Sequence, residues 1–313
     1  MRVKRRRPTS VFLALSALSL GLIAWSGPVA APAGAQNSPA PALTLKKAHR
    51  GESFPDFRGK KPIFVLILGS DSRSKQPEAI AHGRADVIEL VGINPVQKKA
   101  SILGFPRDSW VNIPGHGMNK INDAMYYGGP EGAVNVIEDL TGIQIDYYAL
   151  SSFYWFREMV RDLGGVDVVV PYDMSDSYSK ARFKAGKRHL NGKQALAFTR
   201  NRHDPPNGDF GRSYNCGTML ISFLKDFQED FKQNPGLMLD WIGAGNRYTR
   251  TDLAFDELVD FAFLGSEIPA KKVNNFVVPG STGMEGSESV VHISPSANAM
   301  YADMRADGII KGG

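Results

Sequence analysis

The chain of 313 residues has a single cysteine, Cys216, so a disulfide framework and a cysteine-based zinc site are both excluded. Four other signatures are missing: the P-loop, the Gly-x-Gly-x-x-Gly turn, the His-Glu-x-x-His zinc motif and the Gly-x-Ser-x-Gly elbow. Their absence argues against a P-loop nucleotide hydrolase, a Rossmann dehydrogenase, a zinc protease and a serine hydrolase. Cys216 lies in a predicted helix without an apparent partner, and we expect it to be a small core residue.

Acidic residues are absent from residues 1–35, where five basic residues stand close to the start of the chain. These five are Arg2, Lys4, Arg5, Arg6 and Arg7. They account for the formal net charge of +5, and the remainder of the chain is neutral. A nucleic-acid-binding surface would need basic residues within the folded part, so we expect no nucleic-acid partner.

No apolar run is long enough to cross a bilayer comfortably, which takes about 20 residues. The uncharged apolar stretch of residues 11–25 follows the basic residues and precedes a small-residue Ala-Gly-Ala ending at Ala35. This order indicates a secretory signal peptide, or an anchor if the apolar segment is retained. Either reading of residues 1–35 places the rest of the chain outside the cytoplasm, anchored or secreted, at the outer face of a bacterial cytoplasmic membrane.

Residues 36–61 are rich in Pro, Ala, Ser and basic residues, which predicts a linker. From residue 62 to residue 313, predicted strands and helices alternate, with an irregular polar stretch over 172–190. Apolar runs predict strands over 62–69, 86–95, 98–106, 145–152 and 166–171, and helices are expected over 153–165, 192–200 and 211–231. We therefore expect one domain of the α/β class, a three-layer α-β-α sandwich around a central mixed sheet.

Arginine and aspartate recur where the predicted strands begin or end. Four segments carry them: LGSDSR (68–73), GRADVIEL (83–90), GFPRDSW (104–110) and FTRNRHDPPNGDFGR (198–212). Ligands of layered α/β folds bind where strands end, so these segments could meet at one site.

The mixture of Arg and Asp points to phosphate chemistry. The planar guanidinium group binds two phosphate oxygens at once, whereas a carboxylate approaches phosphate through Mg²⁺. Such a set predicts metal-assisted phosphoryl transfer. Taken singly, an Arg-Asp pair at a strand end is more often a structural salt bridge or cap than a ligand site, and His203 is expected to be a loop residue rather than a catalyst.

Eight ordered motifs between residues 62 and 228 resemble the LytR-CpsA-Psr family. They are LGSDSR, GRADVIELVGINP, SILGFPRDSWVNIP, NKINDAMYYGG, DLTGIQIDYYAL, LGGVDV, LNGKQALAFTRNRHD and GDFGR. The resemblance implies transfer of a glycopolymer from a polyprenyl-pyrophosphate carrier to peptidoglycan, dependent on Mg²⁺ or alternatively Mn²⁺. The membrane would be reached through the N-terminal segment or the lipid substrate.

The resemblance also assigns expected roles to residues. Asp71 and Asp86 match the metal ligands, and with Arg107 and Asp108 they form the expected catalytic set. The residues expected to bind pyrophosphate are Arg73, Arg84, Arg107, Lys120, Arg200, Arg202, Asp209 and Arg212. Of these, Asp209 is expected to orient Arg212.

One departure from the family pattern follows Arg212. Asn215 and Cys216 stand where the family commonly has Arg and Gln, which would remove a cation and an amide donor from the anion site. A non-catalytic or pyrophosphatase-like envelope protein that binds polyprenyl phosphate or wall polymer is therefore the alternative function. A transcriptional attenuator is a third reading, against which the exported topology and neutral domain argue.

Overall fold

The computed structural model describes residues 59–205 and 207–311. The predicted signal peptide or anchor (1–35) and residues 36–58 of the predicted linker lie outside the described residues. Within the described ranges, every helix is too short or too polar to cross a bilayer.

The core of the fold is a six-stranded mixed sheet in the order β11-β6-β1-β2-β3-β12. Its strands are β1 (Ile63–Ser70), β2 (Ala85–Asn94), β3 (Lys99–Gly104), β6 (Tyr147–Ser152), β11 (Arg250–Thr251) and β12 (Val273–Val277). β2 is antiparallel to both β1 and β3, whereas β6 is parallel to β1 and β12 is parallel to β3. The end of β1, the start of β2 and the end of β3 consequently meet at one edge.

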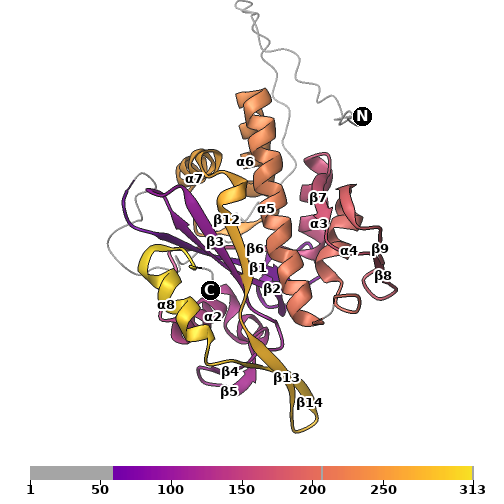
Figure 1. Cartoon of the computed structure of the whole chain (residues 1–313), viewed down its shortest axis with the longest axis vertical. Helices are drawn as coiled ribbons and strands as arrows, with labels where there is room; N and C mark the ends of the chain where they lie inside the picture. The colour runs from indigo at the N-terminus through magenta and orange to yellow at the C-terminus, as the bar shows by residue number, and fades with distance from the viewer. Residues whose placement is uncertain (1–58, 206, 312–313) are drawn as a thin grey trace, which may run out of the picture. The chain divides into compact units, whose positions relative to one another are not determined.

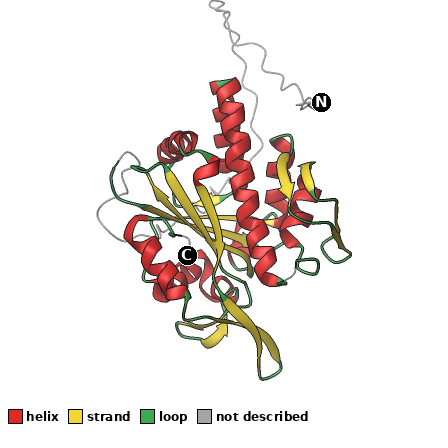
Figure 2. Cartoon of the chain, in the orientation of Figure 1, coloured by secondary structure: helices red, strands yellow, loops and turns green. Residues whose placement is uncertain are grey.

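Helices cover both faces of this sheet (Figures 1 and 2). Alternate residues of β1 point to opposite faces, as the two-residue period of a strand requires. Phe64, Leu66 and Leu68 pack in one buried cluster with α2 (Asp123–Thr141) and α8 (Ala297–Asp307). Ile63 and Val65 pack in another with α7 (Phe255–Glu267), on the face that α5 (Asp209–Gln233) also covers. The predicted three-layer sandwich is confirmed.

A smaller unit of structure corrects one prediction. Residues 172–190 were expected to be irregular, but they contain β8 (Met174–Asp176), β9 (Ala181–Phe183) and β10 (Gly186–Leu190). β10 pairs with β7 (Val166–Val170), and together with α3 (Phe153–Asp162) and α4 (Gly192–Arg200) they surround a second buried cluster. Strands of three to five residues with many charges carry little periodicity in sequence, which is why they were missed.

Further short elements complete the fold. They are α1 (Pro77–Ala81), β4 (Trp110–Ile113), β5 (Gly117–Lys120), α6 (Met238–Tyr248), β13 (Gly280–Glu285), β14 (Glu288–Ile293) and two 3-10 turns, Pro235–Leu237 and Ala270–Lys272. β13 and β14 form a hairpin near the C-terminal end of the chain. This hairpin attaches to the loop after β3, where Val291 N donates to Asp108 O at 2.9 Å and Ser109 bridges to Val291.

The loop from α4 to α5 depends on two glycines. Gly208 has a φ of 55°, a left-handed conformation that disfavours other residues, and it lies directly before α5. A Cβ atom on Gly211 would lie 2.1 Å from Pro205 Cβ, so only glycine lets this loop pack against the first turn of α5. The Asn-Gly and Phe-Gly pairs of the sequence thus return the chain to the sheet edge.

Candidate active site

A charged cavity of about 630 Å³ lies at the sheet edge where β1 ends, β2 begins and β3 ends. Its lining residues are Asp71, Arg84, Asp86, Arg107, Asp108, Lys120, Asn122, Asp123, Arg202, His203, Glu288 and Ser289. The antiparallel pairing of β1, β2 and β3 brings the first five together, as the sequence suggested. Lys120 and Arg202 join them from β5 and from the loop after α4.

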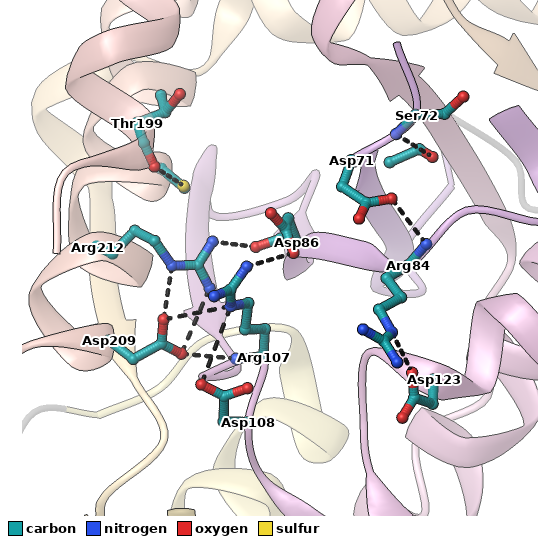
Figure 3. A network of polar contacts seen from close by, with 12 residues as sticks. Asp71, Ser72, Arg84, Asp86, Arg107, Asp108, Asp123, Thr199, Asp209 and Arg212 are labelled. Carbon is teal, nitrogen blue, oxygen red and sulfur yellow. Dashed lines mark hydrogen bonds and ion pairs between the residues drawn. The ribbon is translucent and has the colours of Figure 1, made fainter. Parts of the chain in front are cut away.

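Asp71 and Asp86 are neighbouring carboxylates on these strand ends (Figure 3). Asp71 Oδ1 accepts a hydrogen bond from Arg84 N at 3.0 Å, and Asp86 Oδ1 accepts one from Arg107 Nη1 at 2.7 Å. Burial raises the pKa of Asp71 above its usual value, and the negative charge of Asp86 raises it further. The two carboxylates are therefore close enough to repel each other.

The carboxylates of Asp71 and Asp86 fit a divalent cation whose other ligands come from phosphate. Mg²⁺ commonly takes one or two carboxylates together with phosphate oxygens and water. In residues 59–205 and 207–311, no cluster of three or more His, Cys, Asp or Glu side chains has the arrangement of a metal site. A cation held by Asp71 and Asp86 would therefore need oxygen ligands from a substrate, and it would relieve their mutual repulsion.

Arg107 is held in place by carboxylates from three segments. Besides Asp86, its side chain lies 4.0 Å from Asp108 Oδ2 and from Asp209 Oδ1, and Asp209 Oδ2 accepts from Arg107 N at 2.8 Å. Arg107 Nε is buried and has no hydrogen-bond partner among the described residues. Burial raises the pKa of Asp108, and the charge of Asp209 adds to this effect. This Nε donor is thus enclosed near Asp108 and Asp209 without a hydrogen bond, while 23% of the Arg107 side chain stays exposed at the cavity.

Arg212 is buried behind the cavity rather than open to it. Its Nε donates to Asp209 Oδ1 at 2.7 Å, and its Nη1 donates to the Asp86 carbonyl oxygen. Burial opposes ionisation of Asp209, but the charge and hydrogen bond of Arg212 outweigh it and lower the pKa of Asp209. The predicted pairing of Asp209 with Arg212 is present, and Arg212 also binds the backbone of β2 at Asp86.

The remaining cations differ in how freely they can reach a ligand. Arg84 is 60% exposed although its Nε lies 2.6 Å from Asp123 Oδ1, and Lys120 Nζ lies 3.1 Å from Glu288 Oε2. Arg202 is exposed at the cavity. Cations that keep one side open can bind an anion without losing their present partners.

Arg73 and Arg200 do not line the cavity. Arg200 stacks over the ring of Phe153, with its guanidinium carbon 4.7 Å from the ring centroid. Burial lowers the pKa of Arg200, and the positive charges of Arg73 and Arg107 contribute to this shift, although Asp86 opposes it. Of the three arginines in the 198–212 stretch, Arg202 lines the cavity, Arg212 is buried behind it, and Arg200 lies near enough to Asp86 and Arg107 to interact with their charges. Pyrophosphate binding by Arg73, Arg200 and Arg212 stays a prediction.

Asn215 and Cys216 lie away from the charged cavity. Asn215 lines a second cavity of about 1060 Å³, is fully buried, and donates from Nδ2 to Tyr172 Oη at 3.3 Å. Cys216 is a buried core residue, as expected, and its thiol donates to Thr199 O at 3.5 Å. Position 215 therefore does not point into the cavity that holds Asp71 and Asp86.

Sequence reasoning missed several lining residues. Asp123 and Asn122 begin α2, directly after the NKI segment, where an Asn-Asp pair before a helix resembles an ordinary cap. Glu288 comes from the hairpin, far along the chain, and nothing in its surroundings marks it. His203 was predicted to be a loop residue; it does lie in a loop, and it also lines the cavity.

Comparison with known proteins gives teichoic acid transferases among the relatives of this chain. The teichoic acid transferase TagT of Bacillus subtilis is 39% identical over 150 residues, which are 46% of this chain and 47% of TagT. TagU of Bacillus licheniformis is 30% identical over 254 residues, covering 77% of this chain and 76% of TagU. Both are named polyisoprenyl-teichoic acid–peptidoglycan teichoic acid transferases. The match to TagT spans about half of its length.

Solved structures share the fold. The crystal structure of B. subtilis TagV gives a TM-score of 0.67 at 24% identity, covering 82% of this chain and all (100%) of that chain. TagT bound to LI-WTA gives a TM-score of 0.67 at 23% identity, covering 85% of this chain and 97% of that chain. The LytR_cpsA_psr family matches residues 34–306. The chain therefore belongs to the LytR-CpsA-Psr family.

Proposed function

We propose that the protein is an extracytoplasmic phosphotransferase, which moves a glycopolymer from a polyprenyl-pyrophosphate carrier to peptidoglycan with Mg²⁺ or Mn²⁺ as cofactor. The names of TagT and TagU support the reaction class, and the TagT structure bound to LI-WTA supports a wall-polymer substrate.

The observation that carries the proposal is the composition of one cavity. Two mutually repelling carboxylates, Asp71 and Asp86, lie beside Arg107, whose Nε has no partner within the described residues. Arg84 and Arg202 add exposed cations at the same cavity. Pyrophosphate carries negative charge on several oxygens, so arginine forks together with a carboxylate-bound cation complement it.

The proposed reaction is a displacement at phosphorus. A hydroxyl oxygen of peptidoglycan forms a bond to the phosphorus that bears the glycopolymer, and the bond from that phosphorus to the bridging oxygen breaks. Polyprenyl phosphate leaves and a phosphodiester forms. Mg²⁺ bound at Asp71 and Asp86 would neutralise charge on the pyrophosphate. Arg107, fixed by Asp86 and Asp209, would hold the phosphate oxygens in position.

The proposed location follows from the substrate and from the N-terminal residues. Peptidoglycan lies outside the cytoplasmic membrane, and the basic-then-apolar order of residues 1–35 is that of an exported chain. The membrane would be contacted by this segment or by the lipid of the substrate.

The test uses a polyprenyl-pyrophosphate disaccharide donor, a soluble peptidoglycan oligomer and Mg²⁺, with phosphodiester product measured by mass spectrometry. Asp71→Ala and Arg107→Ala are expected to lower turnover about a hundredfold or more, because each removes charge stabilisation from the reacting phosphate. Arg182→Ala is the matched control: Arg182 is exposed on β9, outside the cavity lining, and its loss should leave turnover unchanged. Chelation by EDTA should stop the wild-type reaction.

Two outcomes would contradict the proposal. If Asp71→Ala and Arg107→Ala both kept wild-type turnover, the cavity would not be the site of the reaction. Tight binding of the donor by the wild type without any product would instead favour the alternative function, a non-catalytic envelope protein that binds the lipid-linked polymer.

A further inference from the structure

A histidine at the charged cavity is paired with a buried carboxylate. His203 lines the cavity from the loop between α4 and α5, and its Nδ1 lies 3.1 Å from Asp176 Oδ1. The side chain of Asp176, the last residue of β8, is only 2% exposed, whereas that of His203 is 44% exposed. Asp176 is thus fixed inside the protein, while the ring of His203 is exposed to the cavity.

The environment of Asp176 determines which ring nitrogen of His203 carries the proton. Asp176 accepts hydrogen bonds from Tyr178 N at 2.9 Å and from Ser179 N at 3.0 Å. Burial alone would favour the neutral acid, but these donors and His203 outweigh it and lower the pKa of Asp176 to about 2. An ionised carboxylate can only accept, so Nδ1 must carry hydrogen and the neutral ring presents the lone pair of Nε2.

Nε2 of His203 has no hydrogen-bond partner within residues 59–205 and 207–311, while the ring is held from one face by Tyr178. The two ring centroids are 4.6 Å apart, in a stacked arrangement, and Tyr178 is itself exposed. The ring is therefore oriented by Asp176 and Tyr178 together, with a basic nitrogen left available.

A second histidine, His189, forms a histidine–carboxylate pair in which both ring nitrogens are engaged by the protein. His189 Nδ1 lies 2.6 Å from Asp167 Oδ1, and its Nε2 lies 3.0 Å from Gly164 O. Both nitrogens of His189 are engaged, and this residue is absent from the lining of the charged cavity. His203 has the same carboxylate contact but keeps its second nitrogen unused beside the proposed substrate site.

The carboxylates of the cavity are already engaged by other groups. Asp86 is paired with Arg107, Asp123 with Arg84, and Glu288 with Lys120. Burial raises the pKa of Asp71 and of Asp108, but Asp71 is assigned to the proposed cation and Asp108 lies 4.0 Å from Arg107 Nε. The groups that share the surroundings of His203 are Asp176, Tyr178, Arg202, Asp204 and the charged residues that line the cavity.

We propose that His203 is the general base of the transfer, accepting the proton of the peptidoglycan hydroxyl at Nε2, and that Asp176 is its positioning residue. This inference rests on the proposed function. As the hydroxyl oxygen bonds to phosphorus and the bridging P–O bond breaks, the hydroxyl proton passes to Nε2. The imidazolium then releases it to the departing polyprenyl phosphate or to water, which restores the neutral ring.

The test compares His203→Gln and Asp176→Asn with His189→Gln in the transfer assay. His203→Gln is expected to lower kcat about a hundredfold or more, as for loss of a general base, with donor affinity unchanged. Asp176→Asn should lower kcat by a smaller factor, and His189→Gln should leave it unchanged. Circular dichroism of each variant verifies folding.

Two further readouts separate a base from a structural residue. A base must be neutral to accept a proton, so wild-type kcat should fall as pH is lowered from about 8 to 5, and His203→Gln should lose this dependence. Added imidazole should restore part of the activity of His203→Ala but none of that of Arg107→Ala.

Outcomes for the two proposals are distinct. Product formed by His203→Gln at the wild-type rate, with the same pH profile, would overturn the role of His203 and leave the proposed function standing. A folded His203→Gln variant that loses donor affinity in proportion to activity would also overturn it, in favour of a binding role. Absence of product from the wild type would overturn the proposed function and this inference together.

Discussion

Two cavities near the start of α5 differ sharply in charge. The first contains five carboxylates and four cations among its lining residues, whereas the second has Asp209 as its one charged lining residue in the part of the chain the structure describes. Asp209 connects them, because it lines the second cavity while its carboxylate accepts hydrogen bonds from Arg107 N, at the first cavity, and from Arg212, buried behind that cavity. The first turn of α5 therefore separates an ionic environment from a mainly neutral one.

This contrast shows how the fold keeps so many charges together. Carboxylates with buried partners, such as Asp209 with Arg212, are matched within the protein, while Arg84 and Arg202 remain exposed. Arg84, although paired with Asp123, and Arg202 lie at the cavity surface with the repelling pair Asp71 and Asp86, where a ligand can bind them. The second cavity has no comparable set of charged side chains among its lining residues.

The largest effect on this contrast should come from Asp209→Ala. Arg212 is only 4% exposed, so its guanidinium group would lose its carboxylate partner inside the protein. We expect the free energy of unfolding to fall by about 3–5 kcal/mol, measured by denaturant titration. Asp173→Ala is the control, because it removes only exposed contacts, with Lys184 Nζ and Ala185 N, and should change the free energy of unfolding much less. Equal losses in the two variants would show that the charges behind the cavity are not internally matched.

A smaller effect should appear in the pH dependence of stability at Asp176. Its pKa is lowered from 3.8 to about 2 in the folded protein, so its stabilisation is present above pH 3.8 and is lost as pH falls toward 2. This lowering of the pKa corresponds to about 2 kcal/mol of stability. We expect Asp176→Asn to be less stable than wild type by about this amount at pH 6, and the difference to shrink toward pH 2. If the stability difference between Asp176→Asn and wild type did not change with pH, ionisation of Asp176 would not be its cause.

The smallest effect is expected in the neutral cavity, from Asn215→Ala. The variant loses a 3.3 Å hydrogen bond to Tyr172, but it also removes the buried Asn215 Oδ1, which has no partner within the described residues. These terms oppose each other, so stability should change by less than about 1 kcal/mol. Transfer activity should stay within about twofold of wild type in the same assay. A large loss of activity would show that the second cavity takes part in the reaction.

Much of the fold was predictable because its main elements are long and strongly patterned. The apolar runs of β1, β2 and β3 have no other plausible place than a buried sheet, and α4 begins and ends at the predicted residues. The short strands β8–β10 and the helix α6 were not predicted, since their stability comes from packing against α3, α5 and α7. Tertiary contacts overrode weak local preferences there.

The candidate site was predictable as a set of residues but not as an arrangement. Asp71, Asp86 and Arg107 meet because antiparallel pairing puts neighbouring strand ends together, which a sequence can indicate. That Arg212 would be buried while Arg202 is exposed depends on the path of the loop around Gly208, which no local pattern specifies. The pairing of His203 with Asp176 could not be predicted, because Asp176 lies on β8, a strand that the sequence pattern did not indicate.

The hairpin of β13 and β14 has a consequence for how the active cavity comes into being. It contributes Glu288 and Ser289 to the lining and is attached through Val291 to the backbone of Asp108. A chain is synthesised from its N-terminus, so Asp71 and Arg107 are made long before this hairpin can dock on them. Glu288 and Ser289 are therefore the last of the lining residues to be made, and a fragment ending after α5 would carry every recognisable motif around an incomplete cavity.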